Sequence, residues 1–240
     1  RGERKLNFGY SKSTFWARLK VTNRTKEQHV WLLSHHYYLQ DEVELFREVE
    51  KGLWISSKTG DTYPFSSREI EARPFTFKIK PSLDSTYYVK IKGTANQMDL
   101  TLSSPVRFAK DQTKDNYILG LFFGLVLSMI FYNAFIFFST RDLSYLFYVL
   151  HVSSYGLGLS LYQGFGQRFL FQNFPLMSNN GITVLIGLMG FFLYLFTIKF
   201  LKLKEEMPKT YRLFTALSIL CLSLVPSAFI FDYSFNLTFQ

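Results

Sequence analysis

Cysteine is almost missing from this chain: among its 240 residues only Cys221 is a cysteine, and it lies in an apolar run. The amino-terminal half therefore cannot form a disulfide, and a buried core has to hold it together. A segment of about 115 residues is long enough to bury such a core. The lack of disulfides does not exclude a location outside the cytoplasm.

Charge is scarce in the second half. Residues 1–116 hold 20 of the 27 Lys and Arg and 14 of the 18 Asp and Glu, which leaves 7 and 4 for residues 117–240. Phe, Leu, Ile, Tyr and Gly fill that half in long uncharged runs. This contrast is typical of a water-soluble domain followed by a membrane-embedded one. We therefore predict two parts, residues 1–114 and 117–240, with the boundary at Lys114–Tyr117.

Motifs of catalysis and metal binding are also absent from the sequence. It contains no glycine-rich phosphate loop and no HExxH, and Cys221 has no evident catalytic partner. His35 and His36 are adjacent on an expected strand, so they point to opposite faces and make a poor metal pair. We predict no enzyme activity within these residues, no cofactor and no metal. A net charge of +9 is compatible with nucleic-acid binding. We expect no such partner, because we place the basic part outside the membrane.

The uncharged runs predict membrane-spanning helices. The 23 residues from Tyr117 to Ser139 carry no charge, and about 20 apolar residues suffice to cross a bilayer. Further spans are predicted at about residues 143–162, 181–201 and 213–231. The lipid bilayer is thus the first expected partner of this half.

Basic residues in the links between spans predict the orientation. The first link carries Arg141, residues 163–180 carry only Arg168, and residues 199–212 carry five Lys and Arg. We therefore expect the first and third links in the cytoplasm and the amino-terminal part outside it.

Two polar residues lie at similar depth in the predicted spans. Asn133 is six residues from the inner end of the first span, and His151 is eight residues from the inner end of the second. At about 1.5 Å per residue, the two depths differ by about 3 Å. Adjacent antiparallel helices can therefore pair these side chains. The pair is either a structural interhelical hydrogen bond or a polar switch inside the bundle.

Alternation of apolar and polar residues predicts strands throughout the soluble part. In "STFWARLKVT" every second residue is apolar from Phe15 to Val21, and in "QMDLTLSS" Met98, Leu100 and Leu102 share one face. Further strands are predicted for "HVWLLSHHYYL", "EVELFREVE", "PFTFKIK" and "YYVKIKG". Turn signals separate these runs, which predicts an antiparallel β-sandwich with no competing helix.

Aromatic residues stand beside cations on the expected outer faces of this sandwich. Trp16 neighbours Arg18, and Tyr88 neighbours Lys90. A flat aromatic ring with a hydrogen-bonding cation often holds a sugar ring or a carboxylate. Alternatively, a neighbouring loop covers Trp16, and Arg18 forms an ion pair.

These segments, taken in order, resemble a known family. "NFGYSKSTFWARLKVTN", "WLLSHHYYLQDEVELF" and "TGDTYPFSSREI" resemble the second extracellular domain type of the bacterial 7TMR-DISM receptors, which are seven-transmembrane receptors with diverse intracellular signalling modules. "NYILGLFFGLVLSMIFYNAFIFFSTRDLSYLF" is similar to the start of their seven-helix region. The resemblance implies a jelly-roll-like sandwich, akin to carbohydrate-binding modules, that senses a ligand outside the bacterial inner (plasma) membrane. It also implies a cytoplasmic output, typically a kinase, a cyclase or a phosphatase.

The resemblance also marks candidate site residues. Trp16 and Arg18 match a Trp-x-Arg strand of the family. Gly60, Asp61, Pro64, Phe65 and Arg68 match its Gly-Asp…Pro-Phe…Arg segment. We hypothesise that Trp16, Arg18, Asp61 and Arg68 converge as a ligand-binding cluster. Alternatively, Asp61 pairs with Arg68 only to fix a loop that Gly60-Asp61 turns tightly.

Together with this resemblance, the sequence predicts a membrane signal-transduction receptor that senses a glycan or another small ligand, as a homodimer if its output is a kinase or cyclase. Only four of seven expected helices and no output domain are present. The chain begins with Arg-Gly-Glu, without an initiator Met or a signal peptide. We interpret it as an internal fragment. The alternatives are a transporter, which would need ionisable residues at the bilayer midplane, and a membrane-anchored carbohydrate-binding module without output.

Overall fold

The computed structural model describes residues 6–24, 29–50, 52–82, 84–172 and 175–230. The chain forms two compact units. The first contains residues 1–114 and 162–178, and the second contains residues 115–161 and 179–240. The chain therefore passes between the units three times, because the segment after the second long helix returns to the first unit.

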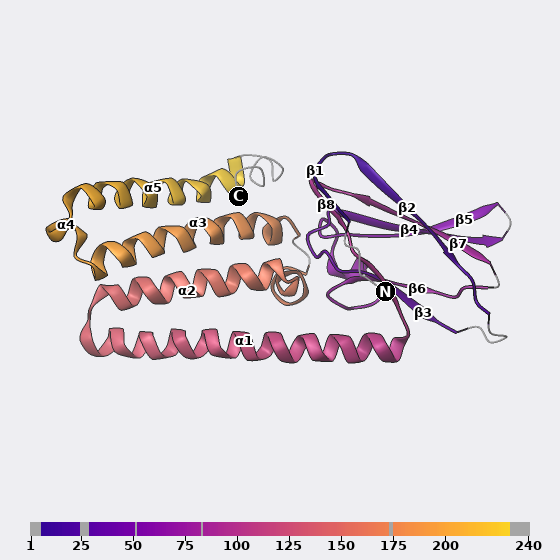
Figure 1. The fold of residues 1–240 in the computed structure, drawn as a ribbon, viewed down its shortest axis with the longest axis horizontal. Coiled ribbons are helices and arrows are strands. Elements are labelled where there is room, and N and C mark those ends of the chain that lie inside the picture. The colour runs from indigo at the N-terminus through magenta and orange to yellow at the C-terminus, as the bar shows by residue number, and fades with distance from the viewer. Residues whose placement is uncertain (1–5, 25–28, 51, 83, 173–174, 231–240) are drawn as a thin grey trace. The chain divides into compact units, whose positions relative to one another are not determined.

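Nine strands build the described part of the first unit. They are β1 (Leu6–Tyr10), β2 (Thr14–Val21), β3 (Trp31–His35), β4 (Glu42–Glu50), β5 (Leu53–Thr59), β6 (Phe75–Ile79), β7 (Ser85–Lys92), β8 (Ala95–Met98) and β9 (Leu100–Ser103). One sheet has the order β2-β7-β4-β5, a second β6-β3-β9, and a small third β1-β8 (Figure 1). All described pairings are antiparallel, so the predicted antiparallel sandwich is confirmed.

The core lies between the two larger sheets. Val43, Leu45, Val89 and Ile91 of the four-stranded sheet pack in one cluster with Phe75 of the three-stranded sheet, and all five are fully buried. The inward residues of β2 pack against this cluster, while its other residues face solvent. This is the period-two pattern that the sequence predicted, because alternate side chains of a strand point to opposite faces.

The stretch "QMDLTLSS" is two strands rather than one. β8 ends at Met98 and pairs with β1, whereas β9 begins at Leu100 and pairs with β3. Between them the Asp99 carbonyl accepts a hydrogen bond from the His36 backbone N–H. Met98 is buried and Leu102 is 43% exposed, so the single face predicted for this stretch was wrong. A chain that changes sheets changes the face that its alternating residues present.

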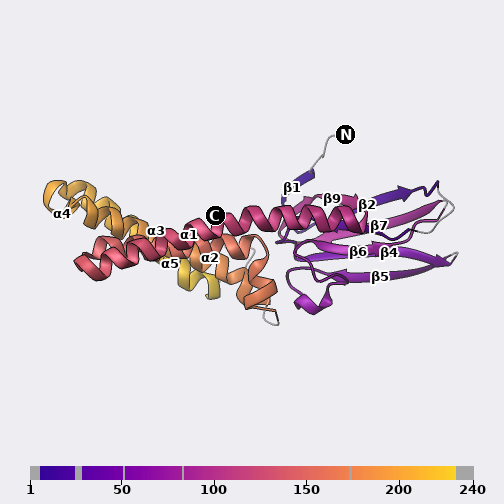
Figure 2. The same cartoon turned by 90° about the horizontal axis from the view of Figure 1, so that it is seen from below.

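Five α-helices lie in the described residues: α1 (Pro105–Thr140), α2 (Leu143–Tyr162), α3 (Pro175–Phe200), α4 (Leu203–Glu206) and α5 (Pro208–Ile230). Two short turns occur as well, the 3-10 turn Phe65–Ser67 and the π-helical turn Gly166–Leu170. In the second unit α1, α2, α3 and α5 run side by side (Figures 1 and 2). Small residues allow this packing, since a Cβ on Gly156 of α2 would lie 3.1 Å from Val126 of α1.

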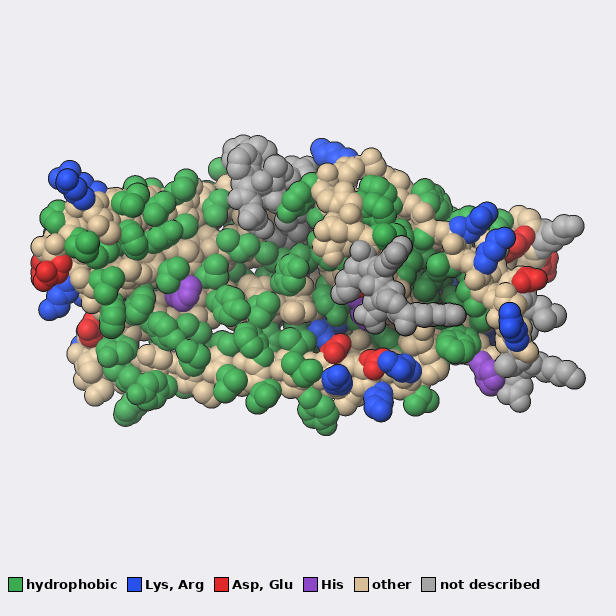
Figure 3. Space-filling model, in the orientation of Figure 1, with side chains coloured by type: hydrophobic (Ala, Val, Ile, Leu, Met, Phe, Trp, Pro, Cys, Tyr) green, Lys and Arg blue, Asp and Glu red, His purple; other side chains and the backbone are tan. Residues whose placement is uncertain are grey.

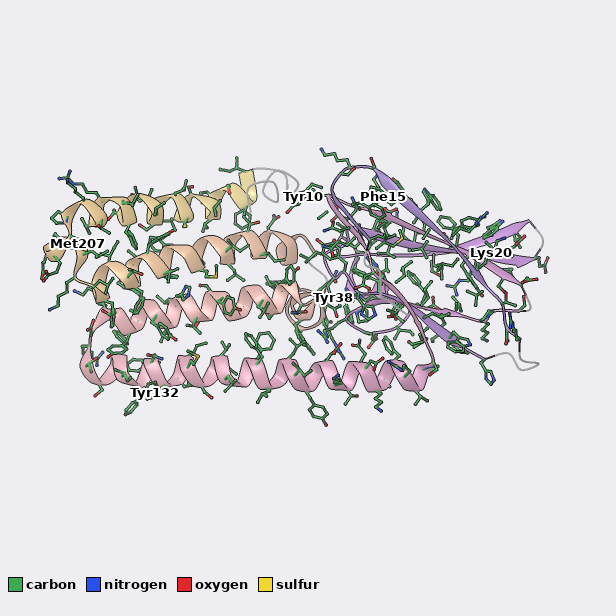
Figure 4. All side chains as sticks on the ribbon, viewed as in Figure 1. Tyr10, Phe15, Lys20, Tyr38, Tyr132 and Met207 are labelled. Atoms are coloured by element: carbon green, nitrogen blue, oxygen red, sulfur yellow. The ribbon has the colours of Figure 1, made fainter. Side chains whose placement is uncertain are left out.

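Three of the described helices are long and apolar enough to cross a membrane, by length and composition: α1, residues Asn180–Phe200 of α3, and α5. Hydrophobic side chains cover the helices in the space-filling view, and Tyr132 of α1 points away from the other helices (Figures 3 and 4). The predicted spans 117–139, 181–201 and 213–231 coincide with them, although residue 231 lies outside the described residues. α2 forms where residues 143–162 were predicted, but its crossing stays a prediction.

α1 begins at Pro105, well before the span predicted from Tyr117. The Ser104 hydroxyl oxygen accepts a hydrogen bond from the Arg107 backbone N–H at 3.3 Å and caps the helix. Pro105 occupies the first helical position, where its fixed φ fits and its missing N–H costs nothing. Our expectation of no helix in the soluble part was wrong here. The charged residues between Pro105 and Tyr117 masked the helix, although its capping serine and its first-turn proline mark where it begins.

Asn133 and His151 have different partners from those expected. The Asn133 side-chain amide donates to the Met129 carbonyl of its own helix at 2.8 Å. The His151 Nδ1 lies 2.9 Å from the Met189 carbonyl of α3. The predicted pair between the first two spans is therefore corrected to a contact between α2 and α3. Equal depth does not determine which face of a helix carries a residue, and a carbonyl has a second lone pair for a nearby donor.

Candidate functional site

The outer face of the four-stranded sheet carries Trp16 and Arg18. Trp16 of β2 lies opposite Lys90 of β7, and Arg18 lies opposite Tyr88. Phe46 of β4 continues the second row, opposite Tyr88. Trp16 is 56% exposed. The face thus combines accessible aromatic rings with cations.

Four aromatic side chains meet in two pairs on this face. The ring centroids of Trp16 and Phe46 are 5.3 Å apart with planes at 34°, and those of Trp54 and Tyr88 are 5.3 Å apart with planes at 59°. Trp54 is 39% exposed. An exposed apolar patch rimmed by polar residues marks an interaction or ligand-binding surface. We call Trp16, Arg18, Phe46, Trp54 and Tyr88 the aromatic face.

Charged side chains adjoin the aromatic face. The Lys90 ammonium lies 2.8 Å from a Glu42 carboxylate oxygen and 3.2 Å from a Glu44 oxygen, and Lys58 lies 2.8 Å from Glu42. Burial raises the pKa of Glu42, but the ammonium groups of Lys58 and Lys90 outweigh this effect and hold the pKa at about 2. The Tyr63 hydroxyl donates to Glu42 at 3.3 Å. Glu42 therefore connects the outer face to the loop that follows β5.

Asp61 and Arg68 lie in that loop and are buried, with 3% and 6% of their surface exposed. The Arg68 guanidinium donates to the Ala72 and Arg73 carbonyls at 2.7 and 2.6 Å. Burial lowers the pKa of Arg68 to about 10, against the opposing effect of the Asp61 carboxylate. The structure thus divides the four predicted residues into an exposed pair on the sheet, Trp16 and Arg18, and a buried pair in the loop.

The buried loop contacts the segment that joins α2 and α3. Gln167, which is 3% exposed, accepts a hydrogen bond on Oε1 from the Arg68 guanidinium. Its Nε2 lies 3.0 Å from the Asp61 carbonyl, 3.1 Å from that of Tyr63 and 3.4 Å from that of Gly60. One side chain therefore holds both a guanidinium and the backbone of the loop.

Further contacts fix the same segment. The Phe65 backbone N–H donates to the Gln172 carbonyl at 3.0 Å. The Arg73 guanidinium, 1% exposed, lies 4.7 Å from the Phe165 ring centroid and 5.5 Å from that of Tyr38, which is labelled in Figure 4. Desolvated cation–π contacts of this kind stabilise by about 2 kcal/mol. Residues 165–172 are thus an integral part of the first unit.

Gly60 is required by a close approach of two chain segments. A Cβ at this position would lie 2.0 Å from the Asp41 carbonyl oxygen and 2.9 Å from the Glu42 Cα. The next residue, Asp61, donates its backbone N–H to the Gln40 carbonyl at 2.9 Å. The Gly-Asp pair, which we predicted as a tight turn, therefore lets the loop pack directly on the start of β4.

The two adjacent histidines face different surroundings. His35 is 1% exposed and stacks on Phe75 with ring centroids 6.2 Å apart. Burial lowers the pKa of His35 to about 4, although the Asp99 carboxylate opposes the shift. His36 Nε2 lies 2.8 Å from the Thr101 hydroxyl. In the part of the chain that the structure describes, no group of three or more His, Cys, Asp or Glu is placed to hold a metal.

Sequence reasoning missed Gln167 and the role of its segment. Residues 163–180 were interpreted only through their charge. A signal was present: "YQGFGQRFLFQ" is rich in aromatic residues although it links two spans, and it contains Gly164, which adopts a φ of +77° and packs against Tyr38. No local pattern, however, indicates which distant residues such a segment contacts.

Comparisons with known families follow the same division of the chain. Residues 1–104 match the family described as 7TMR-DISM extracellular 2, and residues 115–240 match the family described as 7TM diverse intracellular signalling. No curated protein and no solved structure matches the chain. The family matches therefore cover both the strands and the helices.

Proposed function

The chain belongs to the 7TMR-DISM family of membrane receptors, and on that premise we propose that it relays ligand binding outside the cytoplasm to an output domain inside it. The described residues act as sensor and relay, not as the enzyme. A relay of this kind needs two conformations with different affinities for the ligand. Where the output is a kinase or a cyclase, we expect a homodimer.

The aromatic face is the observation that carries the ligand proposal. Trp16, two residues from Arg18 on β2, and Trp54, whose ring packs on Tyr88 opposite Arg18, offer exposed rings on this face. Rings of this type stack against the apolar face of a sugar, while a guanidinium binds a hydroxyl or, in two parallel hydrogen bonds, a carboxylate. We therefore propose a glycan, neutral or acidic, as the ligand.

The contacts of Gln167 support the proposed topology. Gln167 follows α2 in the chain, and it hydrogen-bonds Arg68 and the loop around it, which precede α1. Residues in contact lie on the same side of a membrane, so the chain crosses an even number of times between them. If α1 crosses, as its length and composition allow, α2 crosses back, and we propose this despite its more polar composition.

The basic links then set the direction. Arg141 and the five Lys and Arg of residues 199–212 favour the cytoplasm. We therefore propose that the sandwich and segment 162–178 lie on the other side of a bacterial inner membrane. A reporter that is active only outside the cytoplasm should be active when inserted after Phe169 and inactive after Arg141. The reverse pattern would contradict this orientation.

A thermal-shift screen of the chain in lipid nanodiscs tests the ligand proposal. We expect stabilisation by a subset of neutral and acidic glycans, and loss of that stabilisation in Trp16→Ala and Arg18→Ala. Lys78→Ala is the matched control, because Lys78 is exposed on β6 of the other sheet. Stabilisation that survives both aromatic-face variants would remove the proposed site.

A further inference from the structure

Segment 162–178 lies between two helices in the sequence but belongs to the sandwich unit in the structure. α2 ends at Tyr162 and α3 begins at Pro175, so the segment joins two helices directly. Its residues nevertheless belong to the unit of residues 1–114. Any displacement of the loop that holds the segment is therefore passed by covalent bonds to the ends of two helices at once.

Gln167 attaches the segment to the loop through one set of hydrogen-bond partners, which we call the seat of Gln167. A glutamine amide has two N–H donors and one carbonyl oxygen. Here the donors face three backbone carbonyls, those of Gly60, Asp61 and Tyr63, and the oxygen accepts from Arg68. Buried polar groups that lose such partners carry the full cost of desolvation. The side chain is therefore stable either with all of these partners or released from them, and positions between the two are unfavourable.

Tyr63 links this seat to the aromatic face. Its carbonyl accepts from Gln167 at 3.1 Å, and its hydroxyl donates to Glu42 at 3.3 Å. Glu42 in turn binds the Lys90 ammonium at 2.8 Å, and Lys90 lies opposite Trp16 across β2 and β7. A ligand on the aromatic face that binds Lys90 or Glu42 therefore changes the surroundings of the Tyr63 hydroxyl. Tyr63 is also one of the residues whose carbonyl holds Gln167.

We propose that segment 162–178 is the element through which the sandwich acts on the helices, with Gln167 as the latch that is seated in one signalling state and released in the other. The proposal rests on the proposed function for its claim that a signal passes. The latch itself is a property of the chain without ligand. A two-state element that both regions bias is the physical requirement for such coupling.

Cys221 supplies a reporter within the helices. It is the single cysteine of the chain, so a thiol reagent labels one position. A Cβ on Gly190 of α3 would lie 2.7 Å from the Cys221 sulfur on α5. The thiol is thus packed against the helix that follows segment 162–178, and a shift of α3 changes its accessibility.

The test uses the chain in nanodiscs without ligand and two measurements, amide hydrogen exchange and the rate of Cys221 alkylation by a maleimide. In Gln167→Ala we expect protection of residues 60–68 and 164–171 to fall about tenfold, because hydrogen bonds to a charged group and to buried carbonyls are lost. We expect the alkylation rate to change at least about threefold, because the segment that precedes α3 is no longer held by the loop. Gln167→Met, of similar length, repeats the test with the volume retained.

Gln172→Ala is the matched control. The Gln172 side chain bonds the Arg168 carbonyl within the segment at 2.5 Å, while its backbone carbonyl, which this change keeps, accepts from Phe65. We expect Gln172→Ala to leave both readouts near their original values. An equal effect of the two glutamine changes would overturn the assignment of the latch.

Two other results would overturn the proposal. Unchanged protection in both Gln167 variants would show that this side chain does not hold the segment. Lost protection with an unchanged alkylation rate would show that the segment detaches without acting on α3. In the unaltered chain, residues 164–171 should exchange together with residues 60–68, and separate exchange would also contradict the latch. Because no ligand is present, a negative glycan screen removes only the ligand proposal.

Discussion

The aromatic face and the region around the seat of Gln167 both combine aromatic rings with arginine side chains, but they differ in exposure. On the face, the Trp16 ring is 56% exposed beside Arg18. Next to the seat, the Arg73 guanidinium is 1% exposed and lies over Phe165 of the same segment. An exposed cation and ring are available to a ligand, whereas a buried cation and ring fix one part of the chain to another. Changes on the face should therefore alter affinity, and changes at the seat should alter stability.

The largest expected effect separates Arg68 from Arg18. Arg68→Ala leaves the Ala72 and Arg73 carbonyls and Gln167 without their donor, so we expect the free energy of unfolding to fall by about 4 kcal/mol. Arg18→Ala, on the exposed face, should change it by less than about 0.5 kcal/mol. Urea unfolding followed by tryptophan fluorescence measures both, because all three Trp lie within residues 1–114.

An equal loss in the two arginine variants would remove the contrast between face and seat. Arg68→Lys sharpens it further. A lysine ammonium is a point charge and lacks the planar fork that reaches several acceptors, so this variant should recover only part of the stability.

Acid should destabilise the sandwich through His35. Its pKa is about 4 in the folded chain and about 6.5 when unfolded, so below pH 6.5 the unfolded state binds the extra proton. The contribution of His35 to the free energy of unfolding is therefore fully present above pH 6.5, and it falls by about 3 kcal/mol as the pH drops towards 4. The charges near His35 are those of Asp99, which favours protonation, and His36, which opposes it.

The control for this effect is His35→Leu, which has no titrating group at the position. The difference in unfolding free energy between the two chains, measured in urea from pH 7 to pH 4, isolates the contribution of His35 from that of the carboxylates. A difference that stays constant over this range would contradict a buried neutral His35.

Gly60→Ala should have an intermediate effect. A Cβ placed 2.0 Å from the Asp41 carbonyl oxygen forces two backbone segments apart, and overpacking of this kind costs about 2 kcal/mol. The same urea experiment measures it. Gly52→Ala is a useful comparison, since nothing lies within 4 Å of its Cβ and only its φ of +86° opposes the change.

The smallest effect on stability is expected at the aromatic face. Trp16→Ala removes an exposed ring whose one ring contact among the described residues is Phe46, and we expect a loss of about 0.5 kcal/mol. The same variant should abolish the glycan-dependent thermal shift. A large loss of stability with unchanged ligand response would assign Trp16 to packing.

Much of the fold could be predicted because its signals are local. β2 alternates from Phe15 to Val21, and the run from Tyr117 to Ser139 is uncharged, so each carries its own evidence of a strand or a span. The start of α1 at Pro105 was also encoded locally, in Ser104 and the proline, but the charges around it masked the signal. The break at Asp99 was not encoded in the alternation at all.

The candidate site was predictable only in part. The sequence indicated that Trp16 and Arg18 share a wet face, because residues two apart on a strand point the same way. It did not indicate that Asp61 and Arg68 are buried, because burial depends on what covers them. Part of that cover is Gln167, which lies 99 residues from Arg68 in the chain.

An antiparallel sandwich followed by apolar helices could be inferred from the order of the amino acids alone, since period-two alternation and long uncharged runs need no knowledge of distant partners. Only the folded chain shows that segment 162–178 belongs with the sandwich, that His151 bonds α3 rather than α1, and that Gly60 allows a close contact. Each of these depends on which groups meet across many residues. Such meetings are set by the packing of whole elements, in which a buried donor takes the acceptor that the fold brings to it.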